Sequence, residues 1–125
     1  MSLFDQDWLD QAAKELGNSV GLPSEPLVVT TTVVGGPDGD VTATWRVTAS
    51  GTDVAVESAS DAAVGFSCSH KDAIAIVEGI LAPAVAFMQG RLKTTGDNGV
   101  VIRLLEVAST SGFAELSERL RLIPH

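Results

Sequence analysis

The sequence contains little sulfur and little positive charge. Cys68 is its single cysteine, which excludes an internal disulfide and favours a reducing, cytoplasmic compartment. Lys and Arg together number 8 against 16 Asp and Glu, so the formal net charge is −8. Because there is no Lys/Arg cluster to neutralise phosphates, nucleic acid is not expected as a partner. The same balance argues against simple electrostatic binding to anionic lipid surfaces.

The side chains that most active sites need are also scarce. His70 and His125 are the only histidines, and there is no C-x-x-C or H-x-x-x-H spacing. We therefore expect neither a metal site nor a cofactor. Cys68 and His70 stand two residues apart, where their side chains need not face each other, so a small buried thiol is the favoured interpretation. We do not expect the chain to be an enzyme.

No apolar run reaches the length of a membrane span. The most apolar region, residues 73–88, is interrupted by Glu78, Gly79 and Pro83 and falls short of the roughly 20 residues required. Apolar residues nevertheless make up 45% of the chain, and the mean hydropathy is +0.25. Two interpretations stay open for this region: a helix pair buried in an ordinary core, or the wall of an apolar cavity.

The length of 125 residues predicts a single domain over residues 1–125. The helical spacing of Trp8, Leu9 and Ala12 indicates a first helix that ends at Gly17. Alternating apolar residues then indicate four strands joined by tight turns, which we expect to form an antiparallel meander, and a fifth strand follows later. The predicted strands are 27–34, 41–50, 53–58, 62–68 and 91–95.

Helix signals follow the fourth strand. Ser69 opens an S-x-x-D capping box, and Pro83 suits the first turn of a short helix that Gly90 ends. Asp97 is placed to cap a helix over 98–107, and Ser111 to cap a last helix over 113–120. These elements predict an α+β fold with a five-stranded, antiparallel-rich sheet covered on one face by helices.

Residues 79–105, GILAPAVAFMQGRLKTTGDNGVVIRLL, carry an ordered series of motifs. A G-x-L-x-P element is followed by an apolar A-F-x-x-G helix end, a basic R-L-K strand, a G-D turn and an amphipathic helix. This series resembles the sterol carrier protein 2 (SCP2) lipid-binding domain family, and the preceding strands and capped helix match that family in their order. The matching residues are Gly79, Leu81, Pro83, Ala86, Phe87, Gly90, Leu92, Lys93, Gly96 and Asp97.

The resemblance implies an apolar tunnel between the sheet and its helices. It also implies non-covalent binding and carriage of a sterol, a fatty acid or an acyl-CoA-like lipid. Apolar residues of the middle helices and strands are then candidates for the wall, and Gln89 is a candidate to orient a headgroup, although ordinary core packing stays open for each one. The candidate ligand-binding residues are Trp45, Phe66, Ile74, Val77, Phe87, Met88, Gln89, Val101, Leu104 and Leu105.

The expected partner is thus a lipid or sterol-like small molecule. The sequence leaves transient membrane contact open and does not decide between a monomer and a homodimer. The alternative function is an SCP2-like oligomerisation or partner-docking module without a transport role, in which the apolar face meets another protein. Lipid that co-purifies with the chain would favour the carrier, and an empty stable dimer would favour the module.

Overall fold

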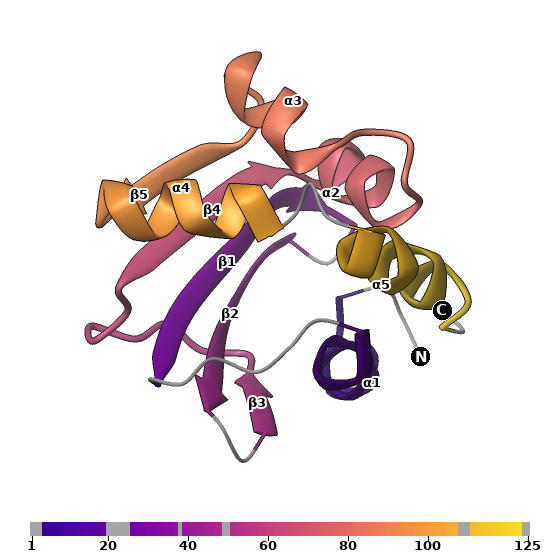
Figure 1. Cartoon of the computed structure of the whole chain (residues 1–125), viewed down its shortest axis with the longest axis horizontal. Coiled ribbons are helices and arrows are strands. Elements are labelled where there is room, and N and C mark those ends of the chain that lie inside the picture. The colour runs from indigo at the N-terminus through magenta and orange to yellow at the C-terminus, as the bar shows by residue number, and fades with distance from the viewer. Residues whose placement is uncertain (1–3, 20–25, 38, 49–50, 108–110, 124–125) are drawn as a thin grey trace.

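The computed structural model describes residues 4–19, 26–37, 39–48, 51–107 and 111–123 (Figure 1). The α+β class and the five-stranded sheet predicted from the sequence are confirmed. The elements follow one another as α1 (Gln6–Ser19), β1 (Leu27–Gly36), β2 (Gly39–Thr48), β3 (Gly51–Ala55), β4 (Val64–Ser69), α2 (His70–Val77), α3 (Pro83–Met88), β5 (Lys93–Gly96), α4 (Asn98–Val107) and α5 (Ser111–Arg121).

The strands lie in the order β3-β2-β1-β4-β5. Three neighbouring pairs are antiparallel, and two of them, β1–β2 and β2–β3, were expected from the meander; β1 and β4, however, run parallel. The predicted meander is therefore wrong after β3, because the chain crosses β2 and β1 before it enters the sheet on the far side of β1. The backbone N–H of Ala63 donates to the carbonyl of Val28 at 2.8 Å, and Asp61 pairs with Arg46 at 2.8 Å. These contacts hold the crossing segment, residues 56–63, on the sheet.

The two faces of the sheet differ in chemistry. The strand register aligns Val29, Trp45, Val54 and Val64 in one row. Because side chains alternate along a strand, this row defines one apolar face, and the helices cover it (Figure 1). The opposite, outer face is rich in threonine and carries the crossing segment. Thr44 on that face is buried, and its hydroxyl donates to a backbone carbonyl of the crossing segment at 2.7 Å.

The helix ends follow the predicted signals. The Ser69 hydroxyl oxygen accepts a hydrogen bond from the backbone N–H of Asp72 at 3.1 Å and so caps α2. Asp97 accepts from two backbone N–H groups in the first turn of α4, at 2.8 and 3.2 Å. Pro83 is the first residue of α3, and Gly90 follows that helix with a φ of +72°. Local capping chemistry therefore sets these boundaries.

Several other predicted boundaries are wrong. The helix α1 continues through Gly17, because a glycine inside a helix costs only about 1 kcal/mol and packing of the apolar side offsets it. The strand β3 begins earlier than expected, at Gly51, and β5 begins at Lys93, so Arg91 precedes the strand. Ser111 is the first residue of α5 rather than its cap.

The apolar region 73–88 divides into the end of α2, a turn and α3. Ala73, Val77, Leu81 and Ala86 point inward and are buried. Ile74, Ala75, Ile76 and Ala84 are half-buried, whereas Ile80, Val85, Phe87 and Met88 are exposed. None of the helices in the described ranges is long and apolar enough to cross a membrane.

Candidate functional site

The apolar face has two halves that meet at Trp45, which packs against the buried clusters of both. The first, which we call the sealed half, lies under α1, α2 and α5. Its cluster consists of ten buried residues, with five half-buried apolar residues packed against them, so most of its apolar side chains are buried. The ten buried residues are Phe4, Trp8, Leu9, Ala12, Ala13, Ala43, Val54, Ala73, Val77 and Ile123.

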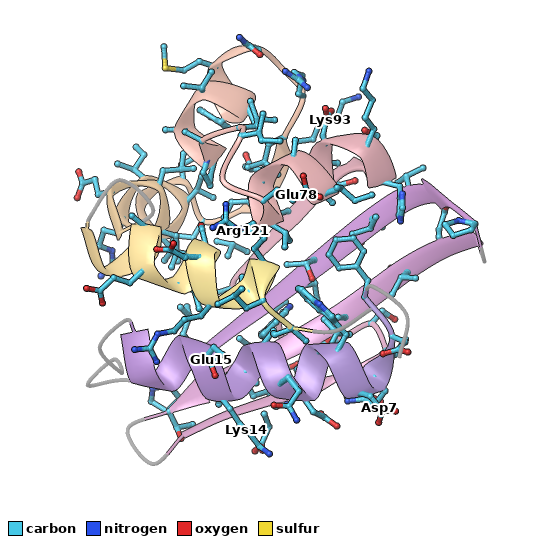
Figure 2. The ribbon with its side chains drawn as sticks, turned by 90° about the vertical axis from the view of Figure 1, so that its right-hand side faces the viewer. Asp7, Lys14, Glu15, Glu78, Lys93 and Arg121 are labelled. Carbon is cyan, nitrogen blue, oxygen red and sulfur yellow. The ribbon has the colours of Figure 1, made fainter. Side chains whose placement is uncertain are left out.

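Polar contacts fasten the helices over the sealed half. The Gln6 side-chain amide donates to the carbonyl of Val54 at 3.0 Å and accepts from the backbone N–H of Val56 at 3.1 Å, so it binds α1 to the edge strand β3. Arg119 of α5 pairs with Glu15 of α1 at 3.3 Å, and Figure 2 shows these two helices side by side. The sealed half therefore has the character of an ordinary core.

The second half, which we call the open half, lies under α4. Only three residues of its cluster are buried, Val29, Val64 and Val101. The other apolar side chains packed there are half-buried, although they point from the sheet and from α4 toward one another. They are Leu27, Phe66, Val100, Leu104 and Leu105, together with Trp45. Apolar area that remains in contact with water gives a driving force for covering it with an apolar ligand.

A third, small cluster attaches α3 to the open half. Leu81, Ala86 and Leu92 are buried, and Phe66 and Leu105 pack against them. Ala86 is fully buried, which places one side of α3 against the body of the protein. Phe66 and Leu105 thus pack against both clusters and link the sheet to α3 and α4.

One polar contact lies within the apolar face. The indole N–H of Trp45 donates to the hydroxyl oxygen of Thr31 at 2.9 Å. Thr31 stands opposite Ala43 on one side and Phe66 on the other. A threonine hydroxyl that accepts one hydrogen bond still has a hydrogen to donate, so this pair offers a single neutral polar group among apolar neighbours.

Five of the predicted ligand-binding residues come together in the open half: Trp45, Phe66, Val101, Leu104 and Leu105. Two others, Ile74 and Val77, pack in the sealed half instead. Ile74 and Val77 lie in the sealed half because their helix, α2, follows β4 directly and packs against α5 and β1.

The remaining three predicted residues lie on α3 and at its end. The side chain of Phe87 is 39% exposed, that of Met88 is 82% exposed, and Gln89 is also exposed. The Gln89 side-chain oxygen accepts a hydrogen bond from the guanidinium of Arg91 at 3.1 Å. The structure thus places these residues at the rim of the open half and does not bring them together with the other candidates.

Arg91 joins the end of α3 to α2. Its Nε donates to a carboxylate oxygen of Asp72 at 3.0 Å, and a second guanidinium nitrogen donates to the same oxygen. This hydrogen-bonded cation holds the pKa of Asp72 below its usual value. The Asp72–Arg91 pair thus ties the end of α3, at the rim of the open half, to α2.

Nucleophilic chemistry finds little support among the described residues. Burial, and secondarily the negative charge of Asp72, raises the pKa of the Cys68 thiol, so the thiol is protonated at neutral pH. The ring of His70 packs edge-on against Phe4, with centroids 5.9 Å apart. His125, the second histidine, lies outside the described residues. No group of three His, Cys, Asp or Glu side chains in the described ranges is placed to hold a metal ion.

Sequence reasoning did not name the buried Val29 and Val64 as site residues. Among the other residues of the open half it missed three: Leu27, Thr31 and Val100. The alternation of β1 could have found two of them, because Leu27 and Thr31 share their side of the strand with Val29. Val100 directly precedes Val101, the first residue of α4 that was predicted to face the ligand.

The comparisons with known proteins agree with the fold. The model of the SCP-2 sterol transfer family matches residues 3–109. No curated protein matches the sequence. A crystal structure of sterol carrier protein 2 has a TM-score of 0.70 at 17% identity, with 98% of this chain and 100% of that chain covered. A solution structure of palmitated SCP2L2 from Aedes aegypti has a TM-score of 0.67 at 19% identity, with 88% of this chain and 96% of that chain covered.

Proposed function

Because the chain belongs to the SCP-2 sterol transfer family, we propose that it binds an apolar lipid, such as a fatty acid or a sterol, and carries it without chemical change. The observation that carries this proposal is the open half, where half-buried apolar side chains converge from the sheet and from α4. The ligand would lie between Phe66, Leu104 and Leu105, in a tunnel that its binding fills. We further propose that this takes place in the cytoplasm.

The hydrophobic effect supplies enough free energy for such binding. Each methylene moved from water to an apolar site contributes about 0.8 kcal/mol, so a chain of about 12 to 16 carbons has roughly 10 kcal/mol of gross driving force. Immobilising the chain and ordering the side chains around it offset several kcal/mol of this. Micromolar or tighter binding is therefore expected without any charged contact. The palmitated Aedes aegypti relative makes a fatty acid the first probe to test.

The polarity of the open half determines which end of the ligand can lie inside it. Its described lining residues are all uncharged, and the Trp45–Thr31 pair is its one described polar contact. Because burying an unpaired carboxylate is far more costly than leaving it in water, a charged headgroup would stay at the rim, beside Gln89 and Arg91. A hydroxyl or a carbonyl, by contrast, could accept the hydrogen of Thr31 inside.

A titration with fluorescent fatty acid and sterol probes tests the proposal. Leu104→Asp places a carboxylate among the lining residues and should weaken binding at least tenfold, since about 1.4 kcal/mol suffices for that factor. The matched control is Val34→Asp, which puts the same charge on the outer face of the sheet, at an already exposed position, and should bind like wild type. The absence of a saturable signal with all probes, or equal losses in both variants, would overturn the proposal. Native mass spectrometry that finds an empty stable dimer would favour a partner-docking module instead.

A further inference from the structure

One hydroxyl group interrupts the apolar row of β1 beneath the helices. The side chains of β1 that share the covered face are those of Leu27, Val29, Thr31 and Val33, because alternate residues of a strand lie on the same side. Three of these four are apolar. Thr31 is half-buried, like most apolar residues of the open half. The central strand of the sheet therefore carries a polar group within reach of the open half.

Thr31 lies where the two halves of the covered face meet. Along β1 it stands between Val29, a buried member of the open half, and Val33, which packs against the cluster of the sealed half. Across the sheet, its Cα partners are Ala43 of the sealed cluster and Phe66 of the open half. The hydroxyl therefore marks the inner end of the open half, beside the packed core.

The indole of Trp45 sets the hydrogen-bonding capacity of this hydroxyl. Its N–H donates to the Thr31 oxygen at 2.9 Å, and Thr31 has no other side-chain hydrogen-bond partner among the described residues. Because an indole N–H only donates, the hydrogen of the hydroxyl is left to bond elsewhere. Accepting one hydrogen bond also polarises the hydroxyl and makes it a better donor. The inner end of the open half thus presents one uncharged donor.

A purely structural role explains this pair less well. A threonine is not needed merely to satisfy the indole of Trp45, which is itself only half-buried. In the sealed half, the indole N–H of Trp8 is buried and has no partner among the described residues. The fold thus tolerates an unpaired indole where packing is closest, and it supplies a hydroxyl where a ligand would end.

A carbonyl oxygen suits this donor better than the other oxygen groups of lipids. It only accepts hydrogen bonds, so the bond from Thr31 satisfies it. An alcohol that accepts the same bond would also bury its own hydrogen among apolar neighbours, which is unfavourable. A carboxylate would exchange its hydration for one uncharged donor, at a much larger cost.

We propose, on the basis of the carrier function proposed above, that the open half selects uncharged lipids with a carbonyl group, such as esters and ketones. These ligands enter with the carbonyl first and accept the hydrogen bond of Thr31 at the inner end. A fatty acid binds in the opposite sense, with its methyl end inside and its carboxylate at the rim. Thr31 is then the residue that determines specificity, and Trp45 positions its hydroxyl.

Competition of three ligands with a fluorescent fatty acid probe tests this assignment. The ligands are methyl laurate, laurate and dodecane, which share the chain and differ at its end. The test variant is Thr31→Val, which removes the hydroxyl and keeps the shape of the side chain. The matched control is Thr32→Val, because Thr32 is also half-buried and its hydroxyl shares a hydrogen bond with that of Thr42 at 3.2 Å, on the outer face.

The loss in Thr31→Val should be specific to the ester. Affinity for methyl laurate should fall about fivefold, as expected for one uncharged hydrogen bond. Affinities for laurate and dodecane should stay unchanged, which also shows that the variant is folded and its site intact. Thr31→Ser keeps the hydroxyl and should retain the wild-type preference, and Thr32→Val should bind all three ligands like wild type.

Infrared spectroscopy of bound methyl laurate detects the hydrogen bond itself. The ester carbonyl absorbs apart from the amide groups of the protein, and its stretching frequency falls when the oxygen accepts a hydrogen bond. The frequency in the wild type should be lower than that of the ester dissolved in dodecane, and Thr31→Val should return it to that value. A threonine that served only to hold Trp45 would leave the frequency unchanged.

Two outcomes would overturn the assignment and leave the carrier proposal intact. One is an equal loss of all three ligands in Thr31→Val, or the same ester loss in Thr32→Val. The other is a carbonyl frequency in the wild type that equals the value in dodecane. If none of the ligands displaces the probe and the probe itself does not bind, the carrier proposal fails, and the assignment of Thr31 fails with it.

Discussion

The sealed half and the open half lie on the same face of one sheet, yet their helices cover them differently. Over the sealed half, the Gln6 amide binds α1 to β3, and Phe4 packs edge-on against Trp8 with ring centroids 5.1 Å apart. Over the open half, α4 approaches β4 and β5 only lightly, and its side chains stay half-buried. We conclude that the sealed half supplies stability to the fold, whereas the open half leaves apolar side chains available to a ligand.

This division has a physical reason. A site that accepts an apolar ligand cannot be packed to the density of a core, because a filled interior leaves no room for it. Incomplete packing costs stability, so the remainder of the domain must be stable enough to hold the fold. The crossing segment on the outer face and the closely packed α1 supply that support.

The largest expected effect compares one position in each half. Trp8→Ala empties a buried site of the sealed half and should lower the free energy of unfolding by about 3–5 kcal/mol. The indole N–H of Trp8 has no hydrogen-bond partner among the described residues, so the substitution breaks no hydrogen bond of the side chain. Leu104→Ala removes a half-buried side chain and should cost only about 1 kcal/mol. Urea unfolding of both variants measures the difference, and equal losses would contradict the division into two halves.

The smallest expected effect concerns the rim of the open half and its dependence on pH. Hydrogen bonds from Arg91 lower the pKa of Asp72 below its ordinary value of 3.8. The ionised carboxylate therefore stabilises the folded state above that value, and this stabilisation is lost as the pH falls through the lower, folded-state pKa. Asp72→Asn should remove this part of the acid sensitivity, as followed by thermal unfolding between neutral and acidic pH.

A second ion pair serves as the comparison for that experiment. Arg46 likewise lowers the pKa of Asp61, but this pair lies on the outer face and is more exposed. Asp61→Asn should change the acid sensitivity of stability without altering binding at the rim. If Asp72→Asn and Asp61→Asn change both stability and probe binding alike, then the Asp72–Arg91 pair has no particular role at the open half.

Local chemistry made part of the fold predictable. The helix α4 has the predicted bounds because the Asp97 carboxylate satisfies the N–H groups that any helix start leaves free. The capped start of α2 and the proline start of α3 were predictable for the same reason. Alternation also placed Trp45 and Phe66 on the face that the helices cover.

What the sequence could not show was which strands become neighbours. Alternation assigns a face to each side chain but not a partner to each strand, so the parallel pairing of β1 with β4 was missed. That pairing decides that Ile74 and Val77 join the sealed half. The exposure of Met88 was equally hidden, because the hydropathy of a six-residue helix does not say which side turns toward water.

Amide hydrogen exchange, measured with and without saturating palmitate, tests the central claim most directly. The account predicts that the ligand slows exchange in β4 and α4, which line the open half, and leaves α1 and α5 unchanged. Slowed exchange confined to α1 and α5, or no change in β4 and α4 while the probe is bound, would contradict it.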